Sequence, residues 1–138
     1  MPRPTLDFDF YRRMVEQAPE AMIFADREGI IRLWNAKAEA VFGYGANEAV
    51  GRNLDLIIPE NLREAHWRGY NRAIAEGKTK YGGKAMATRA VHKASGRIYV
   101  EMSFSLAGDA HQGVLGALAT ARDITERYLA ERAWRGPQ

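Results

Sequence analysis

The most informative stretch of the chain is Gly113-Val-Leu-Gly-Ala-Leu-Ala-Thr-Ala-Arg122-Asp-Ile-Thr-Glu-Arg-Tyr-Leu-Ala130. Its first ten residues are mostly small or apolar, which predicts a buried strand. Asp123 and Thr125 then offer side-chain oxygens that can cap a helix, and Glu126 adds a negative charge to its first turn. We therefore expect a core strand that passes directly into an exposed helix, which could carry a change in the core to a partner outside it.

The composition is that of one soluble domain. Of the 138 residues, 46% are hydrophobic and 27% are charged, which is ordinary for a globular protein with its own core. No apolar run approaches the roughly 18 residues of a membrane span, and no signal-peptide pattern follows the first residue. The net charge of +3 arises from interleaved basic and acidic residues rather than from a basic stripe. We therefore expect a cytoplasmic protein that binds neither nucleic acid nor a membrane.

The rest of the chain predicts an α+β fold. Helices are predicted over residues 6–18, over 36–42 with Asn35 as the cap, and over 59–76. Strands are predicted over residues 22–26, 30–34, 84–91, 97–107 and 113–122. Turn signals at Ser95-Gly96 and Gly108-Asp109 separate the last three strands. This order favours a five-stranded antiparallel sheet with helices packed on one face, flanked by an N-terminal and a C-terminal helix.

Short motifs along residues 10–130 resemble those of PAS domains. They are Ala18-Pro-Glu-Ala-Met22, Gly29-Ile-Ile31 with Trp34-Asn-Ala36, Phe42-Gly-Tyr44, Val50-Gly-Arg-Asn-Leu54, Ile58-Pro-Glu60, Ser95-Gly96, Val100-Glu-Met-Ser103 and Arg122-Asp-Ile-Thr-Glu-Arg127. The resemblance implies that the sheet and the central helices enclose a ligand pocket. It divides the chain into an amphipathic flanking helix (1–18), a sensor core (19–122) and the start of a signalling helix (123–138). The family's aromatic-proline pair is replaced by Ile98-Tyr99 in a shorter hairpin, so the register of 84–91 is open by one residue.

His66 is the main candidate site residue, because of its position on the helix predicted over residues 59–76. At about 100° per residue this helix gathers on one face Leu62, Ala65, His66, Gly69, Tyr70, Ala73 and Ile74. The imidazole lies near the middle of this face, where a polar ring needs a partner. Small residues around it, and in the last strand Gly116, Ala117, Ala119 and Ala121, leave room for a flat, bulky ligand.

The resemblance to oxygen-sensing PAS domains suggests what that ligand is. Several of them bind haem through a histidine on this helix, and His66 is similar to that axial ligand. Arg72 matches a residue that contacts a haem propionate, and Met102 and Phe104 match positions on the distal side of the iron. Met86 or Met102 could be a sixth ligand, and Leu118 completes the candidate cofactor contacts. The resemblance thus implies haem b, or otherwise another small ligand.

Other interpretations remain open from the sequence. His66 could be a core histidine bonded to a backbone carbonyl or to Glu101, in a cofactor-free module for dimerisation and protein interaction. The pocket could instead take an organic metabolite or lipid.

The chain has no cysteine, which excludes a thiol nucleophile and a flavin adduct. The carboxylates show no acid/base spacing, so we expect that the protein is not an enzyme. The N-terminal stripe of Leu6, Phe10, Tyr11 and Met14 would expose an apolar patch unless it packs on its own sheet or on a second copy. The resemblance implies a homodimer formed through this helix and the outer sheet face. The resemblance implies an effector such as a kinase, a cyclase or a transcription regulator. Whether the chain is free-standing or excised is not determined.

Overall fold

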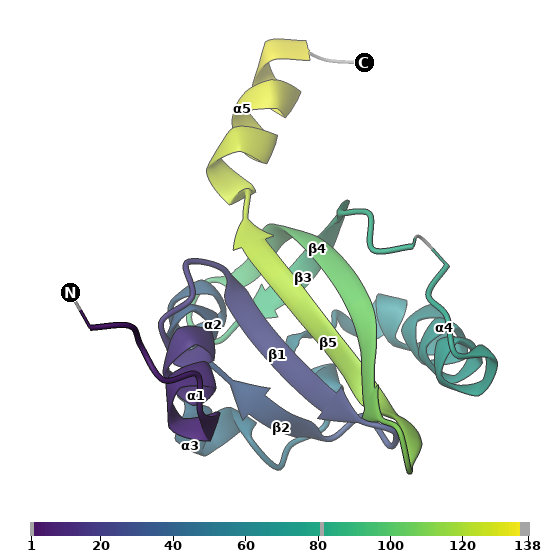
Figure 1. The fold of residues 1–138 in the computed structure, drawn as a ribbon. Coiled ribbons are helices and arrows are strands. Elements are labelled where there is room, and N and C mark those ends of the chain that lie inside the picture. The colour runs from purple at the N-terminus through teal and green to yellow at the C-terminus, as the bar shows by residue number, and fades with distance from the viewer. Residues whose placement is uncertain (1, 81, 136–138) are drawn as a thin grey trace.

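The strands form one antiparallel sheet in the order β2-β1-β5-β4-β3 in a computed structural model that describes residues 2–80 and 82–135 (Figure 1). The strands are β1 (Ala21–Asp26), β2 (Ile31–Trp34), β3 (Met86–His92), β4 (Gly96–Asp109) and β5 (Gly113–Asp123). The α-helices are α1 (Phe8–Glu16), α2 (Ala36–Phe42), α3 (Ala46–Ala49), α4 (Arg63–Glu76) and α5 (Thr125–Arg135), and two 3₁₀ helices are η1 (Leu54–Ile57) and η2 (Glu60–Leu62). The α+β prediction with a five-stranded antiparallel sheet is confirmed.

Several predicted boundaries move. Gly108 and Asp109 belong to β4 rather than to a turn, because the Asp109 carboxylate accepts hydrogen bonds from the backbone of His111 and Gln112 and closes the loop beyond the strand. The predicted helix over 59–76 begins with a 3₁₀ turn, and α4 proper starts at Arg63. Residues 136–138 of the predicted C-terminal segment lie outside the described residues.

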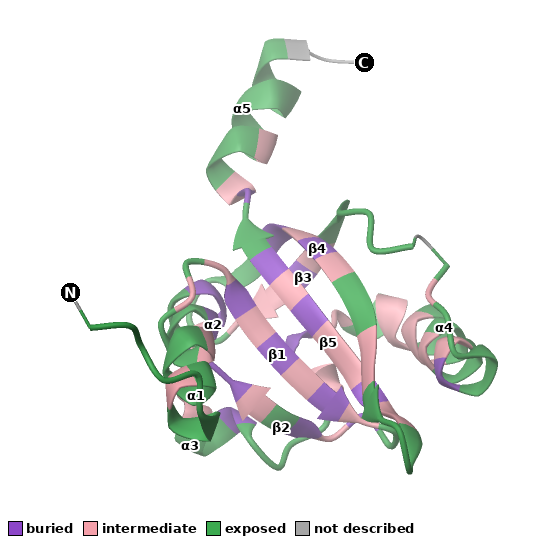
Figure 2. Cartoon of the chain, in the orientation of Figure 1, coloured by how far each residue is buried: buried purple, intermediate pink, exposed green. Residues whose placement is uncertain are grey.

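The two faces of the sheet differ because side chains alternate along each strand. On β5, Ala119 and Ala121 face the core, where they join a buried cluster that includes Ile23, Val100 and Phe42. Figure 2 shows the resulting alternation of buried and less buried residues along β1 and β5. The inner face is the one covered by the helices between β2 and β3, so any ligand space in the core must lie there.

The passage from β5 to α5 is the predicted strand-to-helix junction, and it is tied to β4. The backbone N–H of Ile124 donates to the Tyr99 carbonyl (2.9 Å), and the Asp123 carboxylate accepts from the Thr125 N–H (2.8 Å). The Thr125 hydroxyl does not cap the helix; its oxygen accepts from the Tyr99 N–H at 2.9 Å. The Tyr99 and Tyr128 rings stack with centroids 4.1 Å apart. The first turn of α5 is thus attached to β4, while the rest projects beyond the sheet (Figure 1).

Within the described residues, no helix has the length and apolar character needed to cross a membrane.

Candidate ligand site

Two adjoining cavities lie between the inner face of the sheet and α4. The first, of about 390 Å³, is bounded by η1, η2 and α4 on one side and by the sheet on the other. The second, of about 400 Å³, lies between α4, the lining residues 79–80 and 83–84, and the strands β4 and β5. Both are lined by Ala65, His66, Tyr70, Phe104 and Ala117. Each volume is in the range of about 300–1,000 Å³ found for small-molecule sites.

Helix α4 leaves this space because its apolar face is not packed. Of its 14 residues, only Ile74 is buried, although helices in proteins gain most of their stability from a packed face. Ala65, Gly69 and Ala73 instead line the second cavity. An additional Cβ at Gly69 would meet no atom within 4 Å. The helix therefore stands beside the sheet with room in front of its small residues.

His66 lies where the two cavities meet. Its Nδ1 atom is enclosed and has no hydrogen-bond partner among the described residues. The ring contacts Trp67 edge-on (centroids 4.6 Å apart) and lies 5.7 Å from the ring of Tyr70. Burial lowers the pKa of the imidazole, although the charge of Asp55 opposes this shift. His66 is therefore neutral at pH 7, and one ring nitrogen can act as a ligand or an acceptor.

The sequence left open that His66 is a core histidine hydrogen-bonded to a backbone carbonyl or to Glu101, and the structure shows neither hydrogen bond among the described residues. Glu101 accepts a hydrogen bond from Arg127 at 3.4 Å, and the described residues provide no hydrogen bond to Nδ1 of His66. Among these residues there is also no group of three or more acidic or imidazole side chains that could hold a metal ion. His66 thus offers an isolated imidazole rather than a member of a cluster of acidic and imidazole side chains.

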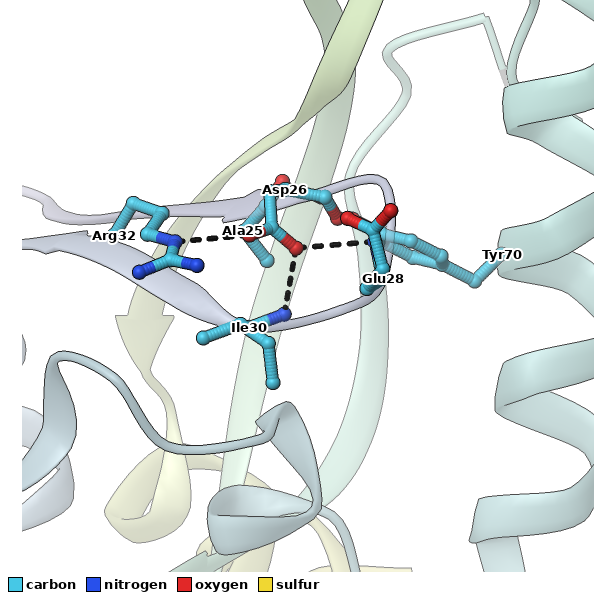
Figure 3. Close-up of polar contacts among 6 residues, drawn as sticks. All are labelled: Ala25, Asp26, Glu28, Ile30, Arg32 and Tyr70. Atoms are coloured by element: carbon cyan, nitrogen blue, oxygen red, sulfur yellow. Dashed lines mark hydrogen bonds and ion pairs between the residues drawn. The ribbon is translucent and has the colours of Figure 1, made fainter.

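Tyr70 ties α4 to the β1–β2 hairpin. Its hydroxyl donates to the carbonyl oxygens of Ala25 (3.1 Å) and Asp26 (2.5 Å), and its ring lines both cavities. Burial raises the pKa of Tyr70 to about 12, so the hydroxyl remains a donor at physiological pH. Figure 3 shows the ring reaching from the helix to the hairpin turn. The position of His66, one helical turn away, therefore depends on this attachment.

The hairpin turn that receives Tyr70 is itself fixed by the side chain of Asp26 (Figure 3). One carboxylate oxygen accepts from the backbone of Glu28 and Ile30, each at 3.0 Å, and the other accepts from Arg32 at 2.8 Å. Burial raises the pKa of Asp26, but the hydrogen bonds from Ile30 and Arg32 outweigh it and hold the pKa below its ordinary value. The carboxylate therefore stays charged and keeps the turn closed.

Trp67 makes a second attachment of α4. Its indole N–H donates to the Asp55 carboxylate of η1 at 2.7 Å, and its ring lies over Gly29, where a Cβ would come within 2.1 Å of it. Gly29 has φ of +82°, a conformation that favours glycine. Neither Trp67 nor Tyr70 was predicted as an anchor. The available signal was the polar tip of each ring, which needs a partner when buried.

The family model for the PAS fold matches residues 9–124. This chain belongs to the PAS family. The PAS domain of a protein from Colwellia psychrerythraea has the same fold, with a TM-score of 0.74 and 22% identity over 86% of this chain and 98% of that one. Sensor protein FixL of Bradyrhizobium diazoefficiens is 40% identical over 55 residues, which is 40% of this chain and 11% of FixL. Oxygen sensor protein DosP of Escherichia coli is 27% identical over 111 residues, 80% of this chain and 14% of DosP.

The PAS structure brings together four of the six predicted site residues. His66, Met86, Met102 and Phe104 all line the first cavity. Met86 and Met102 are paired across β3 and β4, which also fixes the register that the sequence left open.

The other two predicted residues lie elsewhere. Arg72 is exposed on α4 and does not line either cavity. Leu118 is on the outer face of the sheet, because its neighbours Ala117 and Ala119 line the first cavity and side chains alternate along β5. The structure therefore gives neither residue a contact with a ligand in these cavities.

Gly116 also differs from its predicted role. It was expected to leave space in the pocket, but it does not line either cavity. A Cβ there would lie 2.0 Å from the Ala25 carbonyl oxygen of β1. This glycine permits two strands to approach, whereas Ala117 and Ala119 provide the small side chains of the cavity wall.

Proposed function

We propose that this PAS domain is the sensory part of a larger signalling protein and that it senses through a haem b cofactor bound beside His66. The observation that carries the proposal is the neutral imidazole of His66, which has no hydrogen-bond partner at Nδ1 among the described residues and lies where two cavities meet. Neutral imidazole is a frequent axial ligand of haem iron. Similarity to a protein named as an oxygen sensor supports the same function.

The residues around His66 suit a flat and largely apolar group. Ala65 and Ala117 are small, and the Phe104 ring lines both cavities. Met86 and Met102 supply thioether sulfurs in the first cavity, and a thioether can ligate haem iron opposite a histidine. When bound, haem would supply an iron whose ligation depends on its oxidation state and on gases such as oxygen.

The proposed output is α5. Met102 lines the first cavity on β4, and Tyr99 of the same strand holds the start of α5 through hydrogen bonds to Ile124 and Thr125. A ligand-dependent shift of β4 would therefore move the helix. An effector such as a kinase, a cyclase or a transcription regulator would receive this change, and the division of the chain at residues 18 and 122 is part of the same proposal.

A haem titration followed by absorption spectroscopy tests this function. The wild-type protein is expected to take up one equivalent of haem b and to develop a sharp Soret band. His66→Ala is expected to bind at least about 100-fold more weakly, because even loss of a residue that only orients a metal ligand typically costs 10–100-fold. His111→Ala is the matched control, since His111 is exposed in the β4–β5 loop, and should bind as the wild type does.

Two results would contradict the haem proposal. One is the absence of stoichiometric uptake by the wild type, and the other is an unchanged spectrum and affinity in His66→Ala. In either case a screen of organic metabolites by thermal shift would show whether the cavities bind another ligand, since a ligand of the native state raises Tm by mass action.

A second candidate function is self-association, which α1 favours. None of its residues is buried, as the colours of α1 in Figure 2 show. Phe8, Tyr11 and Met14 are exposed to 83%, 53% and 44%. Exposed apolar side chains grouped on one element are typical of an interaction surface. We propose that two copies associate through α1 and the outer face of the sheet, with or without a ligand.

Sedimentation velocity over a range of concentrations tests this association. The wild type is expected to form a dimer, and the double variant Tyr11→Glu/Met14→Glu to remain a monomer at the same concentration. Gln17→Glu, which adds a charge at the exposed end of the same helix, should dimerise normally. A wild-type protein that stays monomeric at high concentration would exclude this candidate.

A further inference from the structure

The charges around the two cavities are of one sign. Among the described residues, no Asp or Glu lines either cavity, whereas Lys80 and Lys84 line the second and Arg89 lines the first. Arg89 pairs with Tyr99 on β4, one residue away from Ala90, which faces the core. Its side chain is therefore on the outer face, and Arg89 lines the cavity with its backbone. The cationic groups of the site are thus confined to the second cavity.

Lys84 is one of the two lysines that line the second cavity. It is exposed in the segment before β3 and forms no hydrogen bond or ion pair with another described residue. The remaining lining of the second cavity is mostly small or apolar, with Phe104, Leu106 and Ala117 on the side of the sheet. A ligand that fills this space therefore meets a mostly small or apolar lining together with the two lysines, Lys80 and Lys84.

This arrangement discriminates between ligands by charge. An anionic group beside Lys84 gains a favourable interaction that strengthens where the surroundings are less polar than water. A neutral group gains much less. A cationic group would be repelled by Lys84, and neither cavity offers it a carboxylate partner among the described residues.

We infer that the ligand is an apolar molecule with an anionic group, and that Lys84 holds this group at the second cavity. The inference rests on the proposed function, since it concerns the ligand of the same site. It replaces the expected role of Arg72, which is exposed and does not line either cavity. Haem b belongs to this class through its carboxylates, and so does a long-chain carboxylic acid.

The test compares two porphyrins that differ in the charge of their carboxyl groups. The full chain is titrated with haem b and with haem b dimethyl ester, whose carboxylates are blocked, and both affinities are measured from absorption. The wild type is expected to bind haem b at least about tenfold more tightly than the ester, corresponding to one charge-assisted contact. Lys84→Met, which removes the charge but keeps most of the length of the side chain, should reduce this ratio to near 1, and Arg72→Met should leave it unchanged.

The outcomes separate this inference from the proposed function. Equal binding of both porphyrins by the wild type, an unchanged ratio in Lys84→Met, or a ratio abolished by Arg72→Met would overturn the role of Lys84 and leave the haem proposal intact. If neither porphyrin binds, the haem proposal fails, and Tm is measured with dodecanoate and with dodecanol. A larger rise with dodecanoate that disappears in Lys84→Met supports the inference, and any other result overturns it.

Discussion

Gly116→Ala is expected to lower the free energy of unfolding by about 3 kcal/mol, at the upper end of the range for overpacked sites. The added Cβ would lie 2.0 Å from the Ala25 carbonyl oxygen, 2.8 Å from the Phe24 ring and 2.9 Å from the Asp26 Cα. Two of these three contacts are backbone atoms of the paired strand β1, so no side-chain rotation can relieve them. The strands must separate or the sheet must bend.

The same substitution should also disturb the ligand site. The Ala25 carbonyl that the new Cβ would displace is an acceptor for the Tyr70 hydroxyl, and Tyr70 fixes α4 beside His66. We therefore expect weaker ligand binding in the fraction of Gly116→Ala that still folds.

Urea unfolding followed by circular dichroism measures the loss of stability, with Gly69→Ala as the matched control. A Cβ at Gly69 meets no atom within 4 Å, and alanine is favoured over glycine in a helix by about 1 kcal/mol. The two glycine-to-alanine changes are thus expected to act in opposite directions. A Gly116→Ala protein as stable as the wild type would show that β1 and β5 can move apart at little cost.

These two glycines show what the sequence could and could not predict. The small residues of β5 indicated a buried strand, and the cap at Asp123 indicated a helix directly after it; both are local signals. The close approach of β1 to Gly116 involves residues about ninety positions apart in the chain, and no local pattern reports it. The sequence therefore predicted strand β5 correctly. It did not predict that Gly116 serves the close approach of β1 rather than leaving space in the pocket.

In the candidate site, too, the sequence predicted the local features but not the contacts between distant segments. The helical spacing of His66 with Ala65 and Tyr70 placed them correctly on one face, because that phase depends only on 3.6 residues per turn. Leu118 was misplaced because a shift of one residue along a strand moves a side chain to the opposite face. The enclosure of His66 and the anchoring of Tyr70 depend on how α4 meets the hairpin, which the sequence alone did not predict.

Asn35→Ala is expected to have a larger effect, about 4 kcal/mol. The sequence predicted that Asn35 caps α2, and its side-chain oxygen does accept from the Ala38 N–H at 3.0 Å. The same oxygen accepts from the Met22 N–H at 2.9 Å, and the amide nitrogen donates to the carbonyls of Val15 (2.8 Å) and Glu20 (3.1 Å). Loss of a cap alone costs about 1 kcal/mol, and each buried group left unpaired adds about 1–3 kcal/mol.

A control variant and a second substitution at Asn35 test whether the loss of stability comes from the hydrogen bonds of this side chain. Asn71→Ala, at an exposed position of α4, should change the free energy of unfolding by no more than about 0.5 kcal/mol. Asn35→Asp keeps both acceptor contacts but places a carboxylate against two carbonyl oxygens, and burial and repulsion raise the pKa of such a group. Because its folded-state pKa would lie above the unfolded value, Asn35→Asp should lose stability as the pH rises through that pKa and be less impaired in mild acid than at pH 7. Urea unfolding at pH 5 and pH 7 measures this difference. An Asn35→Ala loss below about 1 kcal/mol would mean that Asn35 acts only as a helix cap, and that the link between α1, β1 and α2 is formed elsewhere.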